Sequence, residues 1–248
     1  YVTSVSYSFD GSKLVSTSGD HTLIIWDVGT GSLIRQITIE EKGILQGIKF
    51  ASFSPDGELL VVASDDNKVH VLNTKSGLEI LLIVGHVAPV NSAFFSADGK
   101  KIISASNDKT VRIWNACTGK ETLILQGHTG NVNFASYSPD DKFVVSASDD
   151  RTIRVWDTQT GQVIQTLEGH SDIVNTASFS SDGKRIVSAS NDQTIKVWDI
   201  KWGTVQTIKN RYEEGIKSAQ FSPDGKSIAL ASWSKITILP FPPIEDLI

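Results

Sequence analysis

Histidine, serine and aspartate recur together in this sequence at a constant step of 42 residues, for example from His86 to His128 to His170. The sets are His86, Ser104 and Asp108; His128, Ser146 and Asp150; and His170, Ser188 and Asp192. These residue types form the triad of serine hydrolases, in which histidine takes the serine proton and aspartate orients the histidine. A hydrolase needs only one triad, and each set here is followed by a tryptophan at the same spacing, namely Trp114, Trp156 and Trp198. The repetition therefore favours a structural role, and it leaves open whether Ser146 or Ser148 takes part.

Other reactive patterns are weaker. The three recurring histidines lie much farther apart than the ligands of a zinc site, and His21 and His70 have no neighbouring cluster with metal-ligand spacing. The run Gly225-Lys226-Ser227 ends like a phosphate-binding loop, but Gln220 stands where that loop needs a glycine. The sequence therefore predicts no catalytic residue, no cofactor, no metal and no enzyme.

The elements that must position these residues are short strands. In residues 127–168 we expect strands at 132–138, 143–148, 152–156 and 163–167, because apolar and β-branched residues alternate there between Asp- and Gly-containing turns. The other parts of the chain are copies of this stretch, and self-similarity at this period is typical of propeller blades. The sequence predicts an all-β fold.

The pairs Gly127-His128 and Trp156-Asp157, together with the turn aspartates Asp98, Asp140, Asp182 and Asp224, resemble the WD-repeat β-propeller family over nearly the whole chain. The resemblance implies four-stranded antiparallel blades. Six repeat units are visible, and the intact protein would form a six- or seven-bladed ring. It also implies that each His–Ser–Asp–Trp set forms a buried hydrogen-bond network, and the first unit would contribute Ser16, Asp20 and Trp26.

One propeller domain is predicted for residues 1–240, and its units differ in how well they keep the repeat. The expected units are 1–42, 43–84, 85–126, 127–168, 169–210 and 211–240, followed by a Pro-rich exit linker at 241–248. In the second unit Ile44, Val62 and Leu72 replace histidine, serine and tryptophan, so Asp66 should contribute less to stability than its counterparts. Three strands are expected in the sixth unit, at 216–222, 227–231 and 235–239, because prolines follow. The chain has no methionine, and we expect it to be part of a longer protein.

One face of the predicted propeller is a candidate for partner binding. The residue after the first apolar position of each inner strand, and the residue before each turn aspartate, should lie at its rim. These are Thr3, Lys49, Asn91, Asn133, Asn175 and Lys217, and Asp65, Asn107, Asp149 and Asn191, with Trp233 as an aromatic addition. They form either an amide-rich docking surface or a feature inherited by duplication of the blades. Trp202, on the opposite face, is either an isolated apolar residue or a contact with a neighbouring domain.

Composition excludes some classes of partner. The net charge is −5 and the pI is about 5.5, so no electrostatic field attracts nucleic acid or anionic lipid. No apolar run approaches the roughly 20 residues that cross a bilayer. The only cysteine, Cys117, has no partner for an internal disulfide, which indicates a reducing, intracellular and cytoplasmic location.

The resulting functional hypothesis is a non-catalytic scaffold for protein–protein interaction. The near-identical units and Pro-rich tail look like the C-terminal arrays of signalling ATPases, which implies a sensor or regulatory domain that contacts neighbouring domains of the same polypeptide. Two alternatives stay open. One is a propeller enzyme, resembling a glycosidase or lyase, with its site at the central hole. The other is a purely structural subunit.

Overall fold

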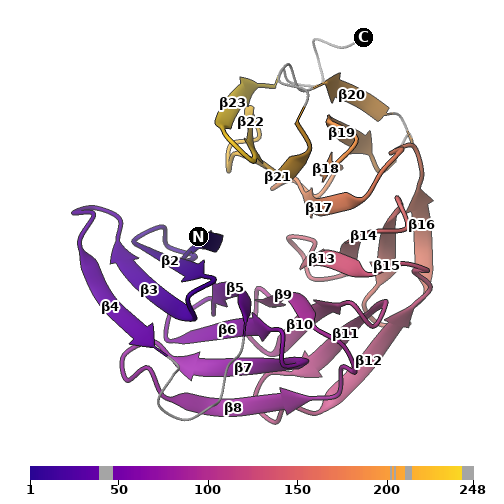
Figure 1. The fold of residues 1–248 in the computed structure, drawn as a ribbon. Helices are drawn as coiled ribbons and strands as arrows, with labels where there is room; N and C mark the ends of the chain where they lie inside the picture. The colour runs from indigo at the N-terminus through magenta and orange to yellow at the C-terminus, as the bar shows by residue number, and fades with distance from the viewer. Residues whose placement is uncertain (39–46, 202, 204, 210–213, 242–248) are drawn as a thin grey trace. The chain divides into compact units, whose positions relative to one another are not determined.

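The computed structural model describes residues 1–38, 47–201, 203, 205–209 and 214–241, and they form only β-strands, turns and loops (Figure 1). No helix long and apolar enough to cross a membrane occurs in these residues. The chain divides into two compact units, Tyr1–Gln126 and Gly127–Ile248. The all-β, antiparallel blade architecture expected from the sequence is confirmed.

The unit Tyr1–Gln126 holds three blades, each an antiparallel sheet whose four strands are hydrogen-bonded in sequence order. Blade 1 consists of β1 (Val2–Tyr7), β2 (Lys13–Ser18), β3 (Thr22–Asp27) and β4 (Leu33–Thr38). Blade 2 consists of β5 (Ile48–Phe53), β6 (Leu59–Ser64), β7 (Lys68–Asn73) and β8 (Glu79–Val84). Blade 3 consists of β9 (Val90–Phe95), β10 (Lys101–Ser106), β11 (Thr110–Asn115) and β12 (Glu121–Gln126).

The unit Gly127–Ile248 holds blades 4, 5 and 6. Blade 4 consists of β13 (Val132–Tyr137), β14 (Phe143–Ser148), β15 (Ile153–Asp157) and β16 (Val163–Leu167). Blade 5 consists of β17 (Val174–Phe179), β18 (Arg185–Ser190), β19 (Thr194–Asp199) and β20 (Val205–Lys209). Blade 6 has three strands in the described residues, β21 (Ile216–Phe221), β22 (Ser227–Ser232) and β23 (Ile236–Pro240). The strand bounds predicted for 127–168 and for blade 6 agree with these within one residue.

The apolar core lies between successive blades of each unit. Val15, Leu23 and Ile25 of blade 1 pack with Leu60 and Val62 of blade 2, and equivalent clusters join blades 2 and 3, 4 and 5, and 5 and 6. The middle strands are covered on both faces, so β14 is buried at almost every position. Burial of one such aliphatic side chain stabilises the fold by about 1.5–3 kcal/mol, so blade stacking holds the loop ends of the strands in place.

Candidate functional site

The recurring histidine sets are hydrogen-bonded chains of side chains. In blade 4, Nδ1 of His128 lies 2.8 Å from Oδ2 of Asp150, and Nε2 lies 2.7 Å from Oγ of Ser146. The indole Nε1 of Trp156 donates to the same serine oxygen at 2.8 Å. Blades 3 and 5 contain the same chains, His86–Asp108, His86–Ser104–Trp114, His170–Asp192 and His170–Ser188–Trp198, at 2.7–2.9 Å. The serine that the sequence left open is therefore Ser146, because Ser148 instead accepts from the backbone N–H of Asp150.

Each aspartate joins two loops of its blade. Asp150 follows β14, and its Oδ1 accepts from the backbone and hydroxyl of Thr152 at 3.0 and 2.7 Å. Its Oδ2 accepts from the N–H of Thr129 in the loop before β13. The carboxylate therefore fixes the turn between the second and third strands to the loop that carries the histidine.

The positions of the protons on His128 and Ser146 follow from the acceptors that these side chains contact. A carboxylate only accepts, so Nδ1 of His128 donates to Asp150, and Nε2 of the neutral ring accepts the serine proton. The side chain of Ser146 is buried, and its oxygen already accepts from the indole of Trp156. Its hydroxyl is therefore covered by the network and is not presented to a substrate.

Burial and hydrogen bonds shift the proton affinities of these groups. Burial alone raises the pKa of Asp150, but the hydrogen bonds from His128 and Thr152 outweigh it and hold that pKa far below its usual range. Burial lowers the pKa of His170, and the nearby Asp192 carboxylate only partly offsets this effect. The shift of Asp150 favours its ionised form, and the shift of His170 favours the neutral form of that histidine.

Blade 1 keeps only part of the network in the described residues. Nε1 of Trp26 donates to Oγ of Ser16 at 2.8 Å, whereas Asp20 is exposed and accepts from Thr22. The adjacent His21 accepts the backbone N–H of Gly47 through Nδ1 at 3.1 Å. Blade 1 therefore has a Trp–Ser bond and a separate Asp–Thr turn.

In blade 2 the structure differs from the prediction made for Asp66. The sequence suggested that Asp66 lacks a histidine partner, because the usual histidine, serine and tryptophan are replaced. In the structure, Nε2 of His70 lies 3.1 Å from Oδ2 of Asp66, and its Nδ1 lies 2.6 Å from Oε2 of Glu79. His70 lies within β7 and is fully buried. Asp66 therefore does have a buried histidine partner, which reaches it from a strand instead of a loop.

The His70 cluster matches a cluster in blade 3. Arg112, 42 residues after His70, contacts Asp108 at 3.5 Å and Glu121 at 2.7 Å, and these acids are the counterparts of Asp66 and Glu79. Both blades thus place a basic side chain between two carboxylates. The signal in the sequence was that His70 shares its register with Arg112, Arg154 and Lys196. Since the two carboxylates of blade 2 contact opposite nitrogens of one ring, they do not converge on a metal, and the described residues contain no group of three potential ligands that could hold one.

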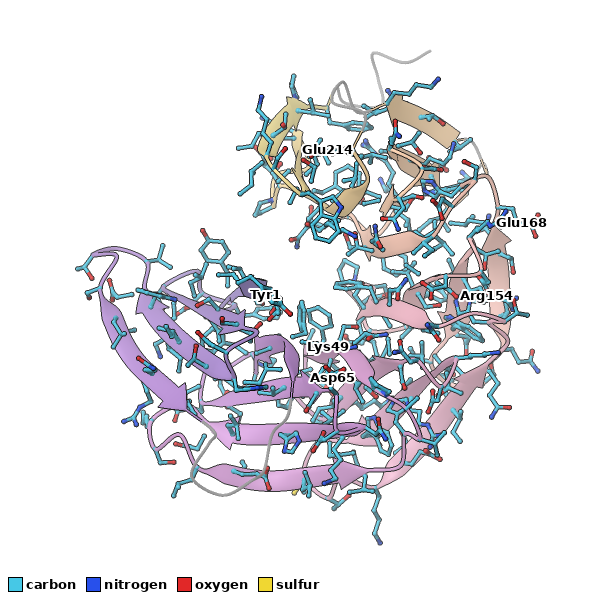
Figure 2. All side chains as sticks on the ribbon, viewed as in Figure 1. Tyr1, Lys49, Asp65, Arg154, Glu168 and Glu214 are labelled. Carbon is cyan, nitrogen blue, oxygen red and sulfur yellow. The ribbon has the colours of Figure 1, made fainter. Side chains whose placement is uncertain are left out.

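The predicted rim residues of the first unit are linked by polar contacts. The Nζ atom of Lys49 lies 2.9 Å from Oδ1 of Asp65 within blade 2 (Figure 2) and donates to Oδ1 of Asn91 in blade 3 at 3.0 Å. Asn91 in turn donates to Oδ1 of Asn107 at 2.7 Å. Thr3 donates to the carbonyl of Ile48, the first residue of β5, at 3.2 Å.

The second unit repeats this arrangement. Asn133 donates to Asp149 at 2.8 Å and to the carbonyl of Val174 in blade 5 at 3.0 Å. Asn175 donates to Asn191 at 2.8 Å and to the carbonyl of Ile216 in blade 6 at 2.7 Å. Asn133 and Asn175 therefore each join their own blade to the next, which is a structural role that the sequence did not indicate.

Blade 6 adds an exposed aromatic residue. Trp233, in the turn between β22 and β23, is 76% exposed, and Nζ of Lys217 lies 4.0 Å from the centre of its ring. Burial lowers the pKa of Lys217, and a cation held over an indole face restricts the motion of both side chains. Trp202, the candidate for the opposite face, lies outside the described residues.

Comparison with known proteins agrees with this geometry. The family model "WD domain, G-beta repeat" matches residues 1–27, 39–73, 78–115, 119–157 and 161–199, which together are more than half of the chain. A WD repeat-containing protein of Dictyostelium discoideum is 40% identical over 86 residues, which are 33% of this chain and 15% of that protein.

Other relatives match over similarly short segments. A nuclear distribution protein of Coccidioides posadasii is 36% identical over 76 residues, 31% of this chain and 15% of that protein. A bromodomain and WD repeat-containing protein of Dictyostelium discoideum is 31% identical over 80 residues, 32% of this chain and 4% of that protein. The matched segments are thus a small part of each relative. The repeat model, the blades and the His–Ser–Asp–Trp chains agree, and the protein belongs to the WD domain, G-beta repeat family.

Proposed function

We propose that this chain is a non-catalytic platform that binds protein or peptide partners at the loop ends of its blades. The observation that carries the proposal is Trp233, a large side chain that is 76% exposed while Lys217 packs on its ring. Tryptophan dominates the binding energy of many protein interfaces, because it buries a large rigid surface at a small entropic cost. The family supports the same function, since WD-repeat propellers generally bind protein partners.

The polar residues near Trp233 would give such an interface its specificity. Asn175 and Asn191 form a fixed amide pair one blade away, and Glu214 accepts from Ser234 at 2.8 Å beside the tryptophan. Side chains already held by hydrogen bonds lose little freedom when a partner binds. In the other unit, the Lys49–Asp65 pair and Tyr1, which is 93% exposed, are candidates for a second contact region.

We further propose that the protein is intracellular and that its partner surface acts as a sensor or regulatory element within a larger signalling protein. The single cysteine Cys117 supports the location, because it leaves no internal disulfide. The tandem repeats, similar to those of signalling ATPases, support the regulatory role. In that setting, neighbouring domains of the same polypeptide would be among the partners.

A peptide selection tests the binding proposal. Random peptides displayed on phage would be selected against the chain, and the affinity of the enriched peptides would be measured by fluorescence anisotropy. Trp233→Ala should weaken binding at least about tenfold, as truncation of a buried tryptophan anchor does. Ile164→Ala is the matched control, because Ile164 is 54% exposed on the outer strand β16. Peptides that lose affinity with Ile164→Ala and keep it with Trp233→Ala would contradict the proposal.

A further inference from the structure

A pocket of about 390 Å³ lies between blades 5 and 6, at the opposite end of β17 and β21 from Asn175 and Lys217. The turns that follow these two strands form its rim, and its walls include Phe221, Phe241 and Arg185. The two phenylalanine rings meet edge to face with their centres 5.6 Å apart. This volume falls within the range of small-molecule sites, roughly 300–1,000 Å³.

Arg185 is the unusual side chain of this pocket. Its guanidinium carbon lies 5.1 Å from the centre of the Phe241 ring. Its Nε and Nη1 atoms are buried, and neither has a hydrogen-bond partner in the described residues. Buried guanidinium N–H groups without an acceptor are costly, so an acceptor that enters the pocket beside this cation would be strongly favoured.

One oxygen of each rim carboxylate is engaged within its own turn. Oδ1 of Asp182 accepts from the hydroxyl of Ser180 at 2.5 Å and from the N–H of Lys184, and Oδ1 of Asp224 accepts from Ser222 and Lys226 in the same way. Burial raises the pKa of Asp182, but the Ser180 hydrogen bond and the Arg185 charge bring it below its usual value. Two ionised carboxylates beside the pocket would repel a dianion such as phosphate more than a monoanion.

The combination of Arg185 with Phe241 is not found at the equivalent positions of the other blades. The backbone bond from Phe241 to the carbonyl of Lys226 has counterparts at Val28, Thr74, Ala116, Thr158 and Ile200, so those residues share the position of Phe241. None of them is aromatic. The counterparts of Arg185 are the first residues of the matching strands, namely Lys13, Leu59, Lys101, Phe143 and Ser227. Among the residues that the structure describes, arginine and phenylalanine meet in this way only where blade 5 adjoins blade 6.

We propose that this pocket binds a carboxylate carried on an apolar body. The carboxylate accepts from the guanidinium of Arg185, and the apolar part packs on Phe221 and Phe241. Lys226, on the rim, adds a second positive charge. Two sources share this chemistry, a free aromatic or aliphatic acid and the C-terminal carboxylate of a peptide that ends in an apolar residue. This site is separate from the partner surface around Trp233.

The test is calorimetric titration of the whole chain with 3-phenylpropionate and, as a neutral match, 3-phenylpropionamide. A short peptide ending in phenylalanine, with a free or an amidated C-terminus, separates the two sources. We expect saturable binding of at least one of the two carboxylates and at least about tenfold weaker binding of its amide, because a hydrogen bond to a charged group is lost. A stronger response to the peptide would identify a protein tail as the ligand, and a stronger response to the free acid would identify a metabolite.

Three variants test whether the carboxylate binds in this pocket. Arg185→Gln should weaken the carboxylate at least about tenfold, and Arg185→Lys should weaken it less. Lysine occupies the equivalent positions 13 and 101 of this chain, so that variant is expected to fold. Lys184→Gln is the control, because it removes one positive charge from the exposed part of the same turn. The proposal is overturned if neither carboxylate binds, if acid and amide bind equally, or if Lys184→Gln weakens binding as much as Arg185→Gln in folded protein.

Discussion

At the residue scale, the main feature of this protein is a turn aspartate that is hydrogen-bonded to a buried histidine in one of two ways. In blades 3, 4 and 5 a histidine from a loop joins aspartate to serine, and the serine accepts from tryptophan. In blade 2 a histidine from a strand joins Asp66 to Glu79 instead. Both arrangements give the turn aspartate a buried partner, and a buried polar network with its groups satisfied adds stability and fixes one packing.

The aspartates should therefore differ in their contribution to stability. Asp150→Ala removes the acceptors of His128 and Thr129 and should lower the free energy of unfolding by about 1–3 kcal/mol. Asp66→Ala, which leaves the buried His70 with Glu79 alone, should give a loss in the same range. Asp20→Ala in blade 1 should cost less, because Asp20 is exposed and has no histidine partner in the described residues. Urea denaturation of the three variants measures this, and equal losses for Asp20 and Asp150 would contradict the assignment.

The buried His170 gives stability a pH dependence with a defined sign. Burial lowers the pKa of His170 in the fold, so near and just below pH 6.5 the unfolded chain binds a proton that the folded chain does not. The free energy of unfolding should fall as the pH drops through this window, and His170→Gln should flatten the fall. The depressed pKa of Asp192 acts in a separate window, below about pH 4. Urea titrations at pH 7.5, 6.5 and 5.5 check this, and parallel slopes for both proteins would disprove it.

At the element scale, the turns between the first and second strands need a left-handed backbone residue. Gly11, Gly57, Gly99, Gly183 and Gly225 supply it with φ of 69–70°. In blade 4 the same position is Asp141, with φ of 58°. A side chain in this region costs free energy that glycine does not, although glycine loses more conformational freedom on folding.

Asp141→Gly should therefore stabilise the protein by about 0.5–1 kcal/mol, the strain relieved minus the extra entropy of glycine. The neighbouring Asp140→Gly is the control. Oδ1 of Asp140 accepts from Ser138 at 2.7 Å and from the N–H of Lys142, so its loss should destabilise the turn. Thermal unfolding of both variants measures the difference. A lower melting temperature for Asp141→Gly would show that the turn depends on the aspartate side chain.

At the scale of the whole molecule, the core consists of contacts between consecutive blades within each unit, and blades 1 and 6 each carry exposed apolar residues on one face. Val5 and Tyr7 of blade 1 are 53% and 62% exposed, whereas their counterparts in blade 2, Ala51 and Phe53, are buried against blade 1. In blade 6, Ile236 and Ile238 are 76% and 69% exposed. A closed ring of six or seven blades stays a prediction of the repeat.

These faces should make the isolated chain self-associate, because contiguous exposed apolar residues on a sheet edge favour pairing with another chain. Replacing Ile236 and Ile238 together by lysine should shift sedimentation velocity profiles towards monomer over a concentration series. Ile164→Lys on β16 is the control, since it adds charge at a comparably exposed position of another strand. A wild-type chain that stays monomeric throughout, or a control with the same effect, would refute this.

The sequence alone determined the features that depend on local periodicity. The alternation of apolar residues and the turn residues predicted the strands of residues 127–168 and of blade 6 within one residue. The constant step grouped His128, Asp150 and Trp156 with a serine that was left open between Ser146 and Ser148. The prolines after Leu239 predicted three strands for blade 6, and its described residues contain three. Each of these predictions depends only on neighbouring residues or on the repeat, so it can be made without coordinates.

Only the tertiary structure decided which side chains meet across strands and blades. His70 reaches Glu79 because β7 and β8 pair in one register. The amide of Asn175 bonds the carbonyl of Ile216, and Arg185 packs on Phe241, because blade 6 stacks on blade 5. The constant step in the sequence does not indicate that these residues contact each other. Their distances follow from the packing of whole sheets, and a repeat pattern specifies which positions are equivalent without specifying what each one touches.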